Sequence, residues 1–265
     1  MWGLVRRVVE RIAPSAGGRF SRYDFGGRPT LGCQISYNRF GGYCVPLSSS
    51  HRPAARKILM GQVYEPLTID FMMSNCQDGD VVHAGAYFGD FLPALSSGCA
   101  EGCKIWAFEP NPENYRCARI TLEMNGIENV DLRNAGISSE RGELPFRTMD
   151  GRGKALGGLS SIVSENSMEG GNSEMVEVLT IDEVIGPERV VSIIQLDIEG
   201  HELEALMGAL GTIRRCLPIL ILEELPDSTL LGGVWFNENI LSLGYSKIGE
   251  FHRNSVFSCS SLSAK

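Results

Sequence analysis

The chain lacks the cysteine and histidine spacings that hold structural zinc. Its eight cysteines include no C-x-x-C pair, and its four histidines do not cluster with them. A zinc finger is therefore excluded, and we interpret the cysteines as reduced, mostly buried thiols. No stretch approaches the roughly 20 apolar residues that span a bilayer, and the N-terminus has no continuous apolar core of a secretory signal. We therefore expect a cytoplasmic protein without a membrane span.

Positive charge is scarce as well. Lysine and arginine number 24 against 32 aspartates and glutamates, which gives a net charge of −8 and an isoelectric point near 5.1. No overall positive field is available to hold nucleic acid, so we do not expect a nucleic-acid partner. Hydrophobic residues make up 43% of the 265 residues, which is enough for one large α/β domain. We place this domain at residues 61–265, after a lead-in of residues 1–60.

The lead-in begins with an amphipathic pattern that ends near Pro14 and Gly17. Its apolar residues share one helical face, at Trp2, Val5, Val9 and Ile12. We expect this helix to dock on its own domain or on a second subunit, which is compatible with a homodimer; a position on a membrane surface is the alternative. Residues 15–50 read as irregular, with short strands near 35–37 and 43–46.

From about Gly61 the sequence alternates between helical and extended patterns. The runs "VVSIIQLD" and "PILILEE" are continuously apolar, which indicates strands covered on both faces. Strands separated by helices predict a parallel sheet with helices on each side, and ligands bind beyond the carboxyl ends of such strands. We predict strands at 80–84, 104–109, 129–134, 191–197 and 218–223, helices at 63–75, 89–97, 112–125, 201–215 and near 235–243, and two closing extended runs, "YSKIGEF" and "SVFSCS".

The middle segment, residues 149–175, has six glycines and little periodicity. A structureless stretch of this length in a compact domain is either a functional lid or a disordered insertion, and the sequence does not decide between them. We expect this segment and the lead-in to form the walls of an acceptor pocket.

The stretch "VVHAGAYFGD" ends the first predicted strand in a glycine turn. A dinucleotide site normally has G-x-G-x-x-G, because its middle glycine lets the backbone approach a pyrophosphate. Here Gly85 and Gly89 flank Ala86, Tyr87 and Phe88, so the middle glycine is missing. The turn therefore favours a ligand without a diphosphate, such as S-adenosylmethionine.

The next predicted strand ends at Glu109, one strand over from the glycine turn. A carboxylate there is placed to accept hydrogen bonds from two ribose hydroxyls. The alternative is that Glu109 or Asn111 only caps the helix that begins near Pro112. After the third strand, small residues leave room for a flat adenine ring, although the same residues also make an ordinary turn; they are Asn134, Ala135 and Gly136.

Four motifs resemble the FkbM family of S-adenosylmethionine-dependent methyltransferases. They are "DGDVVHAGAYFGDF", "AFEPNPENY", "EVLTIDEV" and "IIQLDIEGHELEALMGA", and the similarity covers roughly residues 60–225. The resemblance implies an α/β class I methyltransferase fold, a Rossmann-like three-layer sandwich whose mostly parallel seven-stranded sheet has an antiparallel last strand. It also implies methylation of hydroxyl groups, commonly on sugars or secondary metabolites.

The resemblance implies that Gly85, Tyr87 and Gly89 surround the methionine part of the cofactor, that Glu109 holds the ribose and that Glu65 lies near the cofactor. With the residues proposed from the strand ends, the candidates for S-adenosylmethionine are Glu65, His83, Gly85, Ala86, Tyr87, Gly89, Glu109, Pro110, Asn134, Ala135, Gly136 and Asp197. Two positions depart from the family. His83 stands where the family usually has an aspartate that orders the cofactor's amino acid end, so it is either a buried core histidine or a neutral replacement for that contact. Gln195 stands where lysine is common.

The motif "QLDIEGHE" places acidic residues and a histidine after the fourth strand. Methyl transfer mainly requires alignment of the acceptor oxygen and removal of its proton. His201 suits the base, and Asp197, Glu199 or Glu223 from the next strand end are placed to orient it or to bind acceptor hydroxyls. The alternative is that Asp197 and Glu199 only cap the following helix.

A divalent ion is a further option, because Asp197 and Glu223 are hard oxygen ligands at neighbouring strand ends and magnesium needs only one or two carboxylates. No separate ligand motif supports it, so a metal is not expected. The leading hypothesis is an S-adenosylmethionine-dependent O-methyltransferase acting on a small-molecule or glycan acceptor. The alternatives are a non-catalytic protein that keeps the fold as a scaffold or subunit, and a nicotinamide-dependent oxidoreductase, which the missing glycine disfavours.

Overall fold

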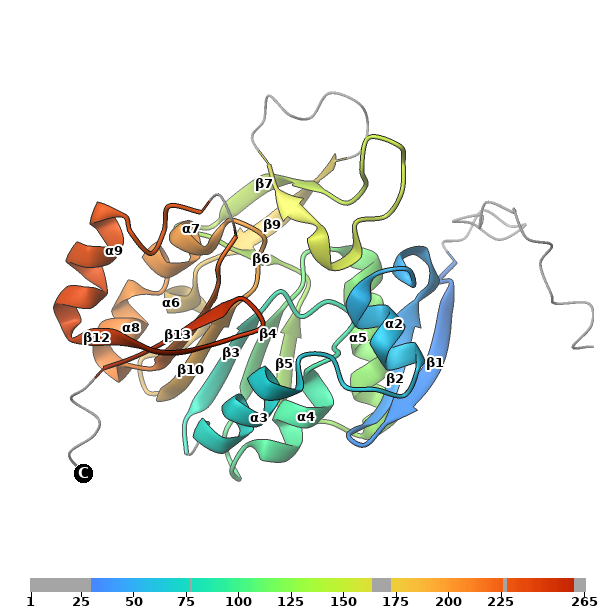
Figure 1. Cartoon of the computed structure of the whole chain (residues 1–265), viewed down its shortest axis with the longest axis horizontal. Coiled ribbons are helices and arrows are strands. Elements are labelled where there is room, and N and C mark those ends of the chain that lie inside the picture. Colours follow the sequence, from blue (N-terminus) through green and yellow to red (C-terminus); the bar gives the residue numbers. More distant parts are fainter. Residues whose placement is uncertain (1–29, 77, 164–172, 226–227, 260–265) are drawn as a thin grey trace, which may run out of the picture. The chain divides into compact units, whose positions relative to one another are not determined.

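The five predicted strands lie side by side in a computed structural model that describes residues 30–76, 78–163, 173–225 and 228–259. They pair in parallel, and the two closing runs complete a seven-stranded sheet in the order β12-β13-β11-β10-β3-β4-β5 (Figure 1). Strand β13 is antiparallel to both of its neighbours, which confirms the predicted fold class. The strands are β3 Asp80–Ala84, β4 Ile105–Phe108, β5 Val130–Arg133, β10 Val191–Leu196, β11 Ile219–Glu223, β12 Tyr245–Phe251 and β13 Asn254–Cys259.

Helices cover both faces of this sheet, and successive residues of a strand contact opposite layers. Val81 of β3 packs in a core with the three helices of one face, while Val82 packs with the helices of the other face. Burial on both faces explains why the strands are continuously apolar. The first layer contains α3 Pro66–Asn75, α4 Leu92–Gly98 and α5 Pro112–Asn125, and the second contains α6 Ile181–Val184, α7 Glu202–Met207, α8 Leu210–Cys216 and α9 Val234–Asn239.

The prediction of one continuous helix at 201–215 is wrong, because the structure has two helices there, α7 and α8. A Cβ added at Gly208 would lie 2.1 Å from the carbonyl oxygen of Ser138. This close backbone approach accompanies the break between the two helices. The helix predicted near 235–243 likewise ends early, at Asn239, and continues as the 3-10 turn η4 Leu241–Leu243.

Part of the predicted lead-in folds against the domain. Strands β1 Cys33–Asn38 and β2 Gly41–Pro46 form a hairpin that is followed by the 3-10 turn η1 Leu47–Ser49 and helix α2 Pro53–Leu59. Strand β2 packs on α5, where the N–H of Cys44 donates to Thr121 Oγ1 at 3.0 Å. These elements belong to the compact unit Cys33–Lys265. The predicted N-terminal amphipathic helix lies outside the described residues.

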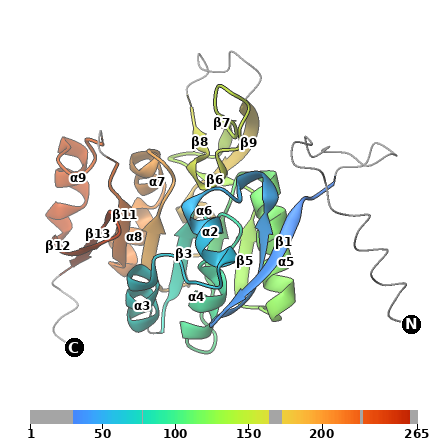
Figure 2. The same cartoon turned by 45° about the vertical axis from the view of Figure 1, so that its right-hand side comes forward.

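A second, four-stranded sheet stands beyond the carboxyl ends of the main strands (Figure 2). Its order is β6-β9-β7-β8, with β6 Gly136–Ile137, β7 Gly142–Arg147, β8 Ser161–Ile162 and β9 Ser173–Leu179, and the 3-10 turn η2 Gly157–Leu159 precedes β8. The prediction of a structureless middle segment is therefore wrong for its described part. Residues distant in sequence pair here, such as Arg147 with Ser173, and such pairs leave no local periodicity.

Neither a membrane-crossing helix nor a disulfide is present in the described part of the chain. No helix there is long and apolar enough to cross a bilayer. All eight cysteines are free thiols, and five of them are buried. The expectation that most of the thiols are buried is confirmed.

Asp80, at the start of β3, is a buried carboxylate that secures the end of the sheet opposite the ligand-binding edge. It is 1% exposed and accepts hydrogen bonds from Lys104 N at 2.9 Å, Trp106 Nε1 at 2.8 Å and Arg189 Nε at 2.7 Å. Burial raises its pKa, but these donors outweigh burial and hold the pKa below its ordinary value.

We expect Asp80→Asn to lower the free energy of unfolding by about 2 kcal/mol at neutral pH, because charged hydrogen bonds are lost. The folded pKa lies below the unfolded one, so this stabilisation is present above about pH 4 and disappears as the pH falls through the folded pKa. Urea denaturation at neutral and acidic pH measures the difference, with the exposed Asp78→Asn as control. A difference that persists unchanged in acid contradicts the assignment.

Candidate active site

The turn after β3 and the tip of β4 are held together by one carboxylate. Glu109 is 5% exposed, and it accepts hydrogen bonds from Tyr87 N at 2.7 Å, Asn111 N at 2.8 Å and Asn114 Nδ2 at 3.3 Å. Burial raises the pKa of Glu109 to about 8, and these donors oppose that rise. A carboxylate has about four acceptor positions, so Glu109 keeps capacity for a ligand hydroxyl.

Asn111, and not Glu109, caps helix α5. The Asn111 side chain accepts hydrogen bonds from the N–H groups of Glu113 and Asn114, and Pro112 occupies the first helical turn. Glu109 lies before the cap and accepts from the Asn111 N–H instead. Of the two roles considered for Glu109, the structure therefore excludes helix capping.

The two neighbouring strand tips share one pocket. Gly85 and Tyr87 from the turn, Glu109 after β4 and Asp197 after β10 all line it. Ala135 and Gly136, which follow β5, also line it, whereas Asn134 of the same predicted set does not. Apolar side chains form much of the remaining wall; they are Phe108, Pro110, Ile137, Phe146, Ile162 and Ile198.

The pocket is narrow in this structure, with a cavity volume of about 40 Å³. That is close to the volume of one water molecule and far below that of an adenosyl group. The turn η2 narrows the pocket because it packs against Tyr87: a Cβ added at Gly157 would lie only 2.7 Å from Tyr87 Oη. The Tyr87 hydroxyl in turn donates a hydrogen bond to Ser49 Oγ at 2.6 Å. The lining therefore fits S-adenosylmethionine in chemical type, but the cavity of this structure is too small to hold it.

The two departures from the family pattern are bonded to each other. His83 Nδ1 contacts Gln195 Oε1 across the neighbouring strands β3 and β10. His83 is 2% exposed and stacks on Phe91 at 5.3 Å between ring centroids. Burial lowers its pKa to about 4, so the pair is neutral. His83 does not line the pocket, and its placement is that of a buried core histidine.

We expect His83 and Gln195 to be coupled in stability. His83→Leu or Gln195→Leu alone leaves a buried polar partner without its hydrogen bond, which costs about 1–3 kcal/mol, whereas replacing both with apolar groups costs less than the sum. Chemical denaturation of the four proteins of this double-mutant cycle measures the coupling. Additive losses contradict the assignment.

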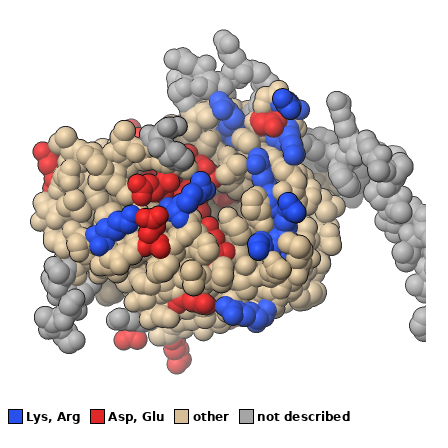
Figure 3. Space-filling view, in the orientation of Figure 1, with Lys and Arg blue, Asp and Glu red and all other residues tan. Residues whose placement is uncertain are grey.

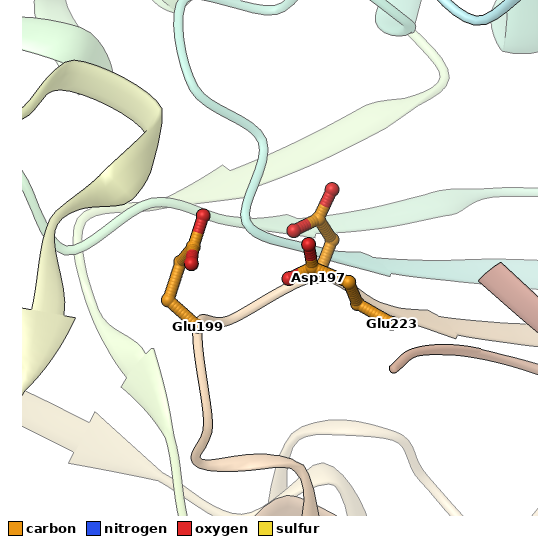
Figure 4. Close-up of side chains that lie close together, drawn as sticks. All are labelled: Asp197, Glu199 and Glu223. Atoms are coloured by element: carbon orange, nitrogen blue, oxygen red, sulfur yellow. The ribbon is translucent and has the colours of Figure 1, made fainter. Parts of the chain in front are cut away.

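Three carboxylates meet beside the pocket at the ends of β10 and β11. One oxygen from each of Asp197, Glu199 and Glu223 lies within 4.8 Å of the others, and Figure 4 shows the three side chains converging. Burial raises the pKa of Asp197 well above its ordinary value, and the nearby Glu223 raises it further. Burial raises the pKa of Glu199 to about 7. Shifted carboxyls that gather at one edge are typical of functional sites.

Neither Asp197 nor Glu199 caps helix α7. Glu202 Oε1 accepts hydrogen bonds from Ile198 N at 3.2 Å and Gly200 N at 3.1 Å, so Glu202 satisfies the backbone of this turn. Glu199 adopts a left-handed backbone conformation with φ of 54°. A non-glycine residue held in this conformation is uncommon and is found often at functional sites.

His201 lies behind this turn and does not line the pocket. Its Nε2 atom contacts Ser138 Oγ at 3.0 Å, and its Nδ1 atom lies 3.6 Å from Glu204. Burial lowers its pKa. The structure thus brings Asp197 to the pocket and places His201, the base favoured from the sequence, in other contacts.

The remaining predicted cofactor residues support the pocket from outside its lining. Glu65 accepts hydrogen bonds from Thr68 Oγ1 at 3.2 Å and Asn254 Nδ2 at 3.1 Å, and burial raises its pKa to about 7. Asn134 donates to the carbonyl oxygens of Glu109 and Pro110. Ala86 is fully buried, and a Cβ added at Gly89 would meet Ala118 of α5 at 3.4 Å.

Several lining residues were not identified from the sequence. Gly157, Gly158, Ser160 and Ile162 come from the middle segment, and Phe146 comes from β7. The sequence did indicate that the middle segment forms a wall, but no local pattern identifies which of its residues face the cavity. That depends on the pairing of β7 with β8 and β9.

Comparison with known proteins gives the family. The sequence model of the methyltransferase FkbM domain matches residues 83–238. The hexuronic acid methyltransferase AglP of Haloferax volcanii is 29% identical over 120 residues, which are 44% of this chain and 45% of that protein; the match thus spans less than half of either protein.

Solved structures of methyltransferases are similar at lower identity. Methyltransferase FkbM from Methylobacillus flagellatus is 20% identical with a TM-score of 0.49, over 68% of this chain and 43% of that one. A SAM-dependent methyltransferase from Aquifex aeolicus is 15% identical with a TM-score of 0.40, over 78% and 93% of the two chains. Because the matched domain covers more than half of its length, the chain belongs to the FkbM methyltransferase family.

Proposed function

We propose that the protein is an S-adenosylmethionine-dependent O-methyltransferase that acts on a hydroxyl group of a sugar, glycan or secondary metabolite. The observation that carries this proposal is the shared pocket of Gly85, Tyr87, Glu109 and Asp197. A tight turn, a carboxylate at the next strand tip and an acidic residue at the third strand end are the features that a sulfonium amino acid, a ribose and an acceptor hydroxyl require.

The lining residues are assigned to parts of the cofactor by their chemistry. Gly85 and Tyr87 contact the methionine part, and Glu109 accepts a hydrogen bond from the ribose. The adenine ring lies against the apolar wall, which includes Ile137, Phe146 and Ile162. Its burial there is favourable because apolar surface of both the ring and the pocket wall is removed from water.

The methyl donor supplies a sulfonium whose thioether leaves as a neutral group. The chain therefore has to align the acceptor oxygen and accept its proton. Asp197 is the proposed proton acceptor, because it lines the pocket directly after β10, at the edge where the acceptor would bind. Glu199 and Glu223 stand beside it and are proposed to bind neighbouring acceptor hydroxyls.

The acceptor class is proposed from the family and from the relative that methylates a hexuronic acid. Figure 3 shows Asp and Glu side chains in the middle of one face, with Lys and Arg side chains close by on either side. Because AglP is a hexuronic acid methyltransferase, hexuronic acids and hexuronate-containing glycans are the first acceptors to test.

The test is calorimetric titration with S-adenosylhomocysteine, followed by transfer of a labelled methyl group to hexuronate acceptors. Saturable binding with one site per chain is the expected result. Failure to bind S-adenosylhomocysteine or S-adenosylmethionine rejects the proposal and leaves the non-catalytic alternative. A parallel titration with NADH tests the oxidoreductase alternative, and we expect it to show no binding.

A further inference from the structure

Three carboxylates converge from two adjacent parallel strands. Asp197 follows β10 directly, Glu199 lies two residues further along the same turn, and Glu223 is the last residue of β11. One oxygen of each lies within 4.8 Å of the others. Figure 4 shows the carboxylates pointing toward one another from the two strand ends.

When all three carboxyls are ionised, donors from the described residues do not satisfy this group. Among the described residues, Arg253 Nη2 is the donor recorded for it, at 2.9 Å from Glu223 Oε1. The Glu223 side chain is only 5% exposed, yet its Oε2 atom is buried without a hydrogen-bond partner in the described part of the chain. A buried carboxylate oxygen without a partner is costly. A cation held among the three carboxylates would satisfy this oxygen.

The charge and the atom type define that ligand. Once a bound cation displaces their protons, three carboxylates beside one guanidinium leave two negative charges, which a divalent cation neutralises. The available ligand atoms are carboxylate oxygens, which Mg²⁺, Mn²⁺ and Ca²⁺ prefer, and sulfur or imidazole ligands of the kind that zinc selects are not part of the cluster. We propose that Asp197, Glu199 and Glu223 form a binding site for one divalent cation of the magnesium class.

The site adjoins the pocket through Asp197, which belongs to both. A cation there has open positions for water and for an acceptor hydroxyl, because the protein supplies three ligands and magnesium takes about six. Coordination would lower the pKa of a bound hydroxyl and orient it, and the three carboxylates would then act on the acceptor through the cation and not directly. This role at the acceptor rests on the proposed methyl transfer, whereas cation binding itself does not.

The experiment measures binding of Mn²⁺ and Mg²⁺ alone to the EDTA-treated, desalted full chain. Electron paramagnetic resonance detects bound Mn²⁺, and calorimetry measures both ions. We expect one Mn²⁺ per chain with competition by Mg²⁺, and at least about tenfold weaker binding in Glu199→Gln and Glu223→Gln, since each loses a charged ligand. Glu199 is the less buried of the two, so Glu199→Gln keeps the test available if Glu223→Gln does not fold.

Glu224→Gln is the matched control. Glu224 is the next residue along the chain, but its carboxylate accepts from Ser255 Oγ at 2.9 Å and lies 3.8 Å from Lys247 Nζ; we expect its cation affinity to equal that of the parent protein. Affinity weaker than about 1 mM in the folded parent protein overturns the proposal, as does an equal loss in all three variants. Titration of the same samples with S-adenosylhomocysteine separates this result from a failure of the proposed methyltransferase function.

Discussion

Glu109→Ala is expected to weaken the binding of S-adenosylhomocysteine about 10- to 100-fold at pH 9, where Glu109 with its pKa of about 8 is ionised. A hydrogen bond to a charged group contributes about 1.5–3 kcal/mol, and about 1.4 kcal/mol corresponds to a tenfold change in affinity. The substitution removes the proposed bond to the ribose. It also removes the acceptor of the Tyr87 N–H, which donates to Glu109 at 2.7 Å, so the turn proposed to contact the methionine part loses this hydrogen bond.

A second variant separates the ligand contact from the loop contact. Glu109→Gln keeps the size of the side chain and one acceptor oxygen, but it loses the charge and the second acceptor. We expect it to bind with an affinity between those of the parent protein and Glu109→Ala. Calorimetry measures each affinity, and thermal unfolding of the same samples confirms that they are folded.

The control is Glu113→Ala, four residues further along the chain in the first turn of α5. The Glu113 carboxylate accepts from Ser48 Oγ at 2.6 Å and does not line the pocket, so its removal should leave the affinity unchanged. If folded Glu109→Ala binds S-adenosylhomocysteine as tightly as Glu113→Ala, the proposed cofactor site is wrong.

The main sheet could be predicted because its signals are local. A strand covered by helices on both faces has to be apolar at every position, and the runs through Val82 and Ile194 meet that condition. The ends of these strands then determine which residues share an edge. Glu109 and Asp197 could be placed near the glycine turn for this reason, without knowledge of any contact between side chains.

The second sheet could not be predicted in the same way. Strand β7 pairs with β9 across a long connection, so that Gly142 lies opposite Val178. Neither strand is buried on both faces, and the connection is rich in glycine. The apolar wall that includes Phe146 and Ile162 follows from this pairing. Tertiary packing, and not the local sequence, determines which of these residues face the pocket.

Side-chain contacts near the site could not be predicted from local sequence patterns either. His83 and Gln195 are 112 positions apart, and each looked like a separate departure from the family; the structure shows that they are partners. His201 has the right chemistry for a base and stands close to Asp197 in sequence. The turn that Glu202 organises directs it to Ser138 instead, and only the folded turn reveals this.

Gly85→Ala is expected to destabilise the protein by more than about 3 kcal/mol. Gly85 has a φ of +88°, which costs an alanine about 1–3 kcal/mol. In addition, the new Cβ would lie 1.9 Å from the carbonyl oxygen of Asp197. That atom belongs to the backbone after β10 and cannot turn aside as a side chain would. The two strand ends that form the pocket would have to separate, so we expect loss of S-adenosylhomocysteine binding as well.

Gly102→Ala isolates the backbone part of this effect. Gly102 has a nearly equal φ of +86°, and nothing lies within 4 Å of a Cβ added there. We expect Gly102→Ala to cost about 1 kcal/mol and to leave binding unchanged, so the difference between the two variants measures the contact with Asp197. Urea denaturation gives both free energies. Equal losses in the two variants would show that β3 and β10 do not approach each other closely at Gly85, and the shared pocket on which the proposed function depends would then be in error.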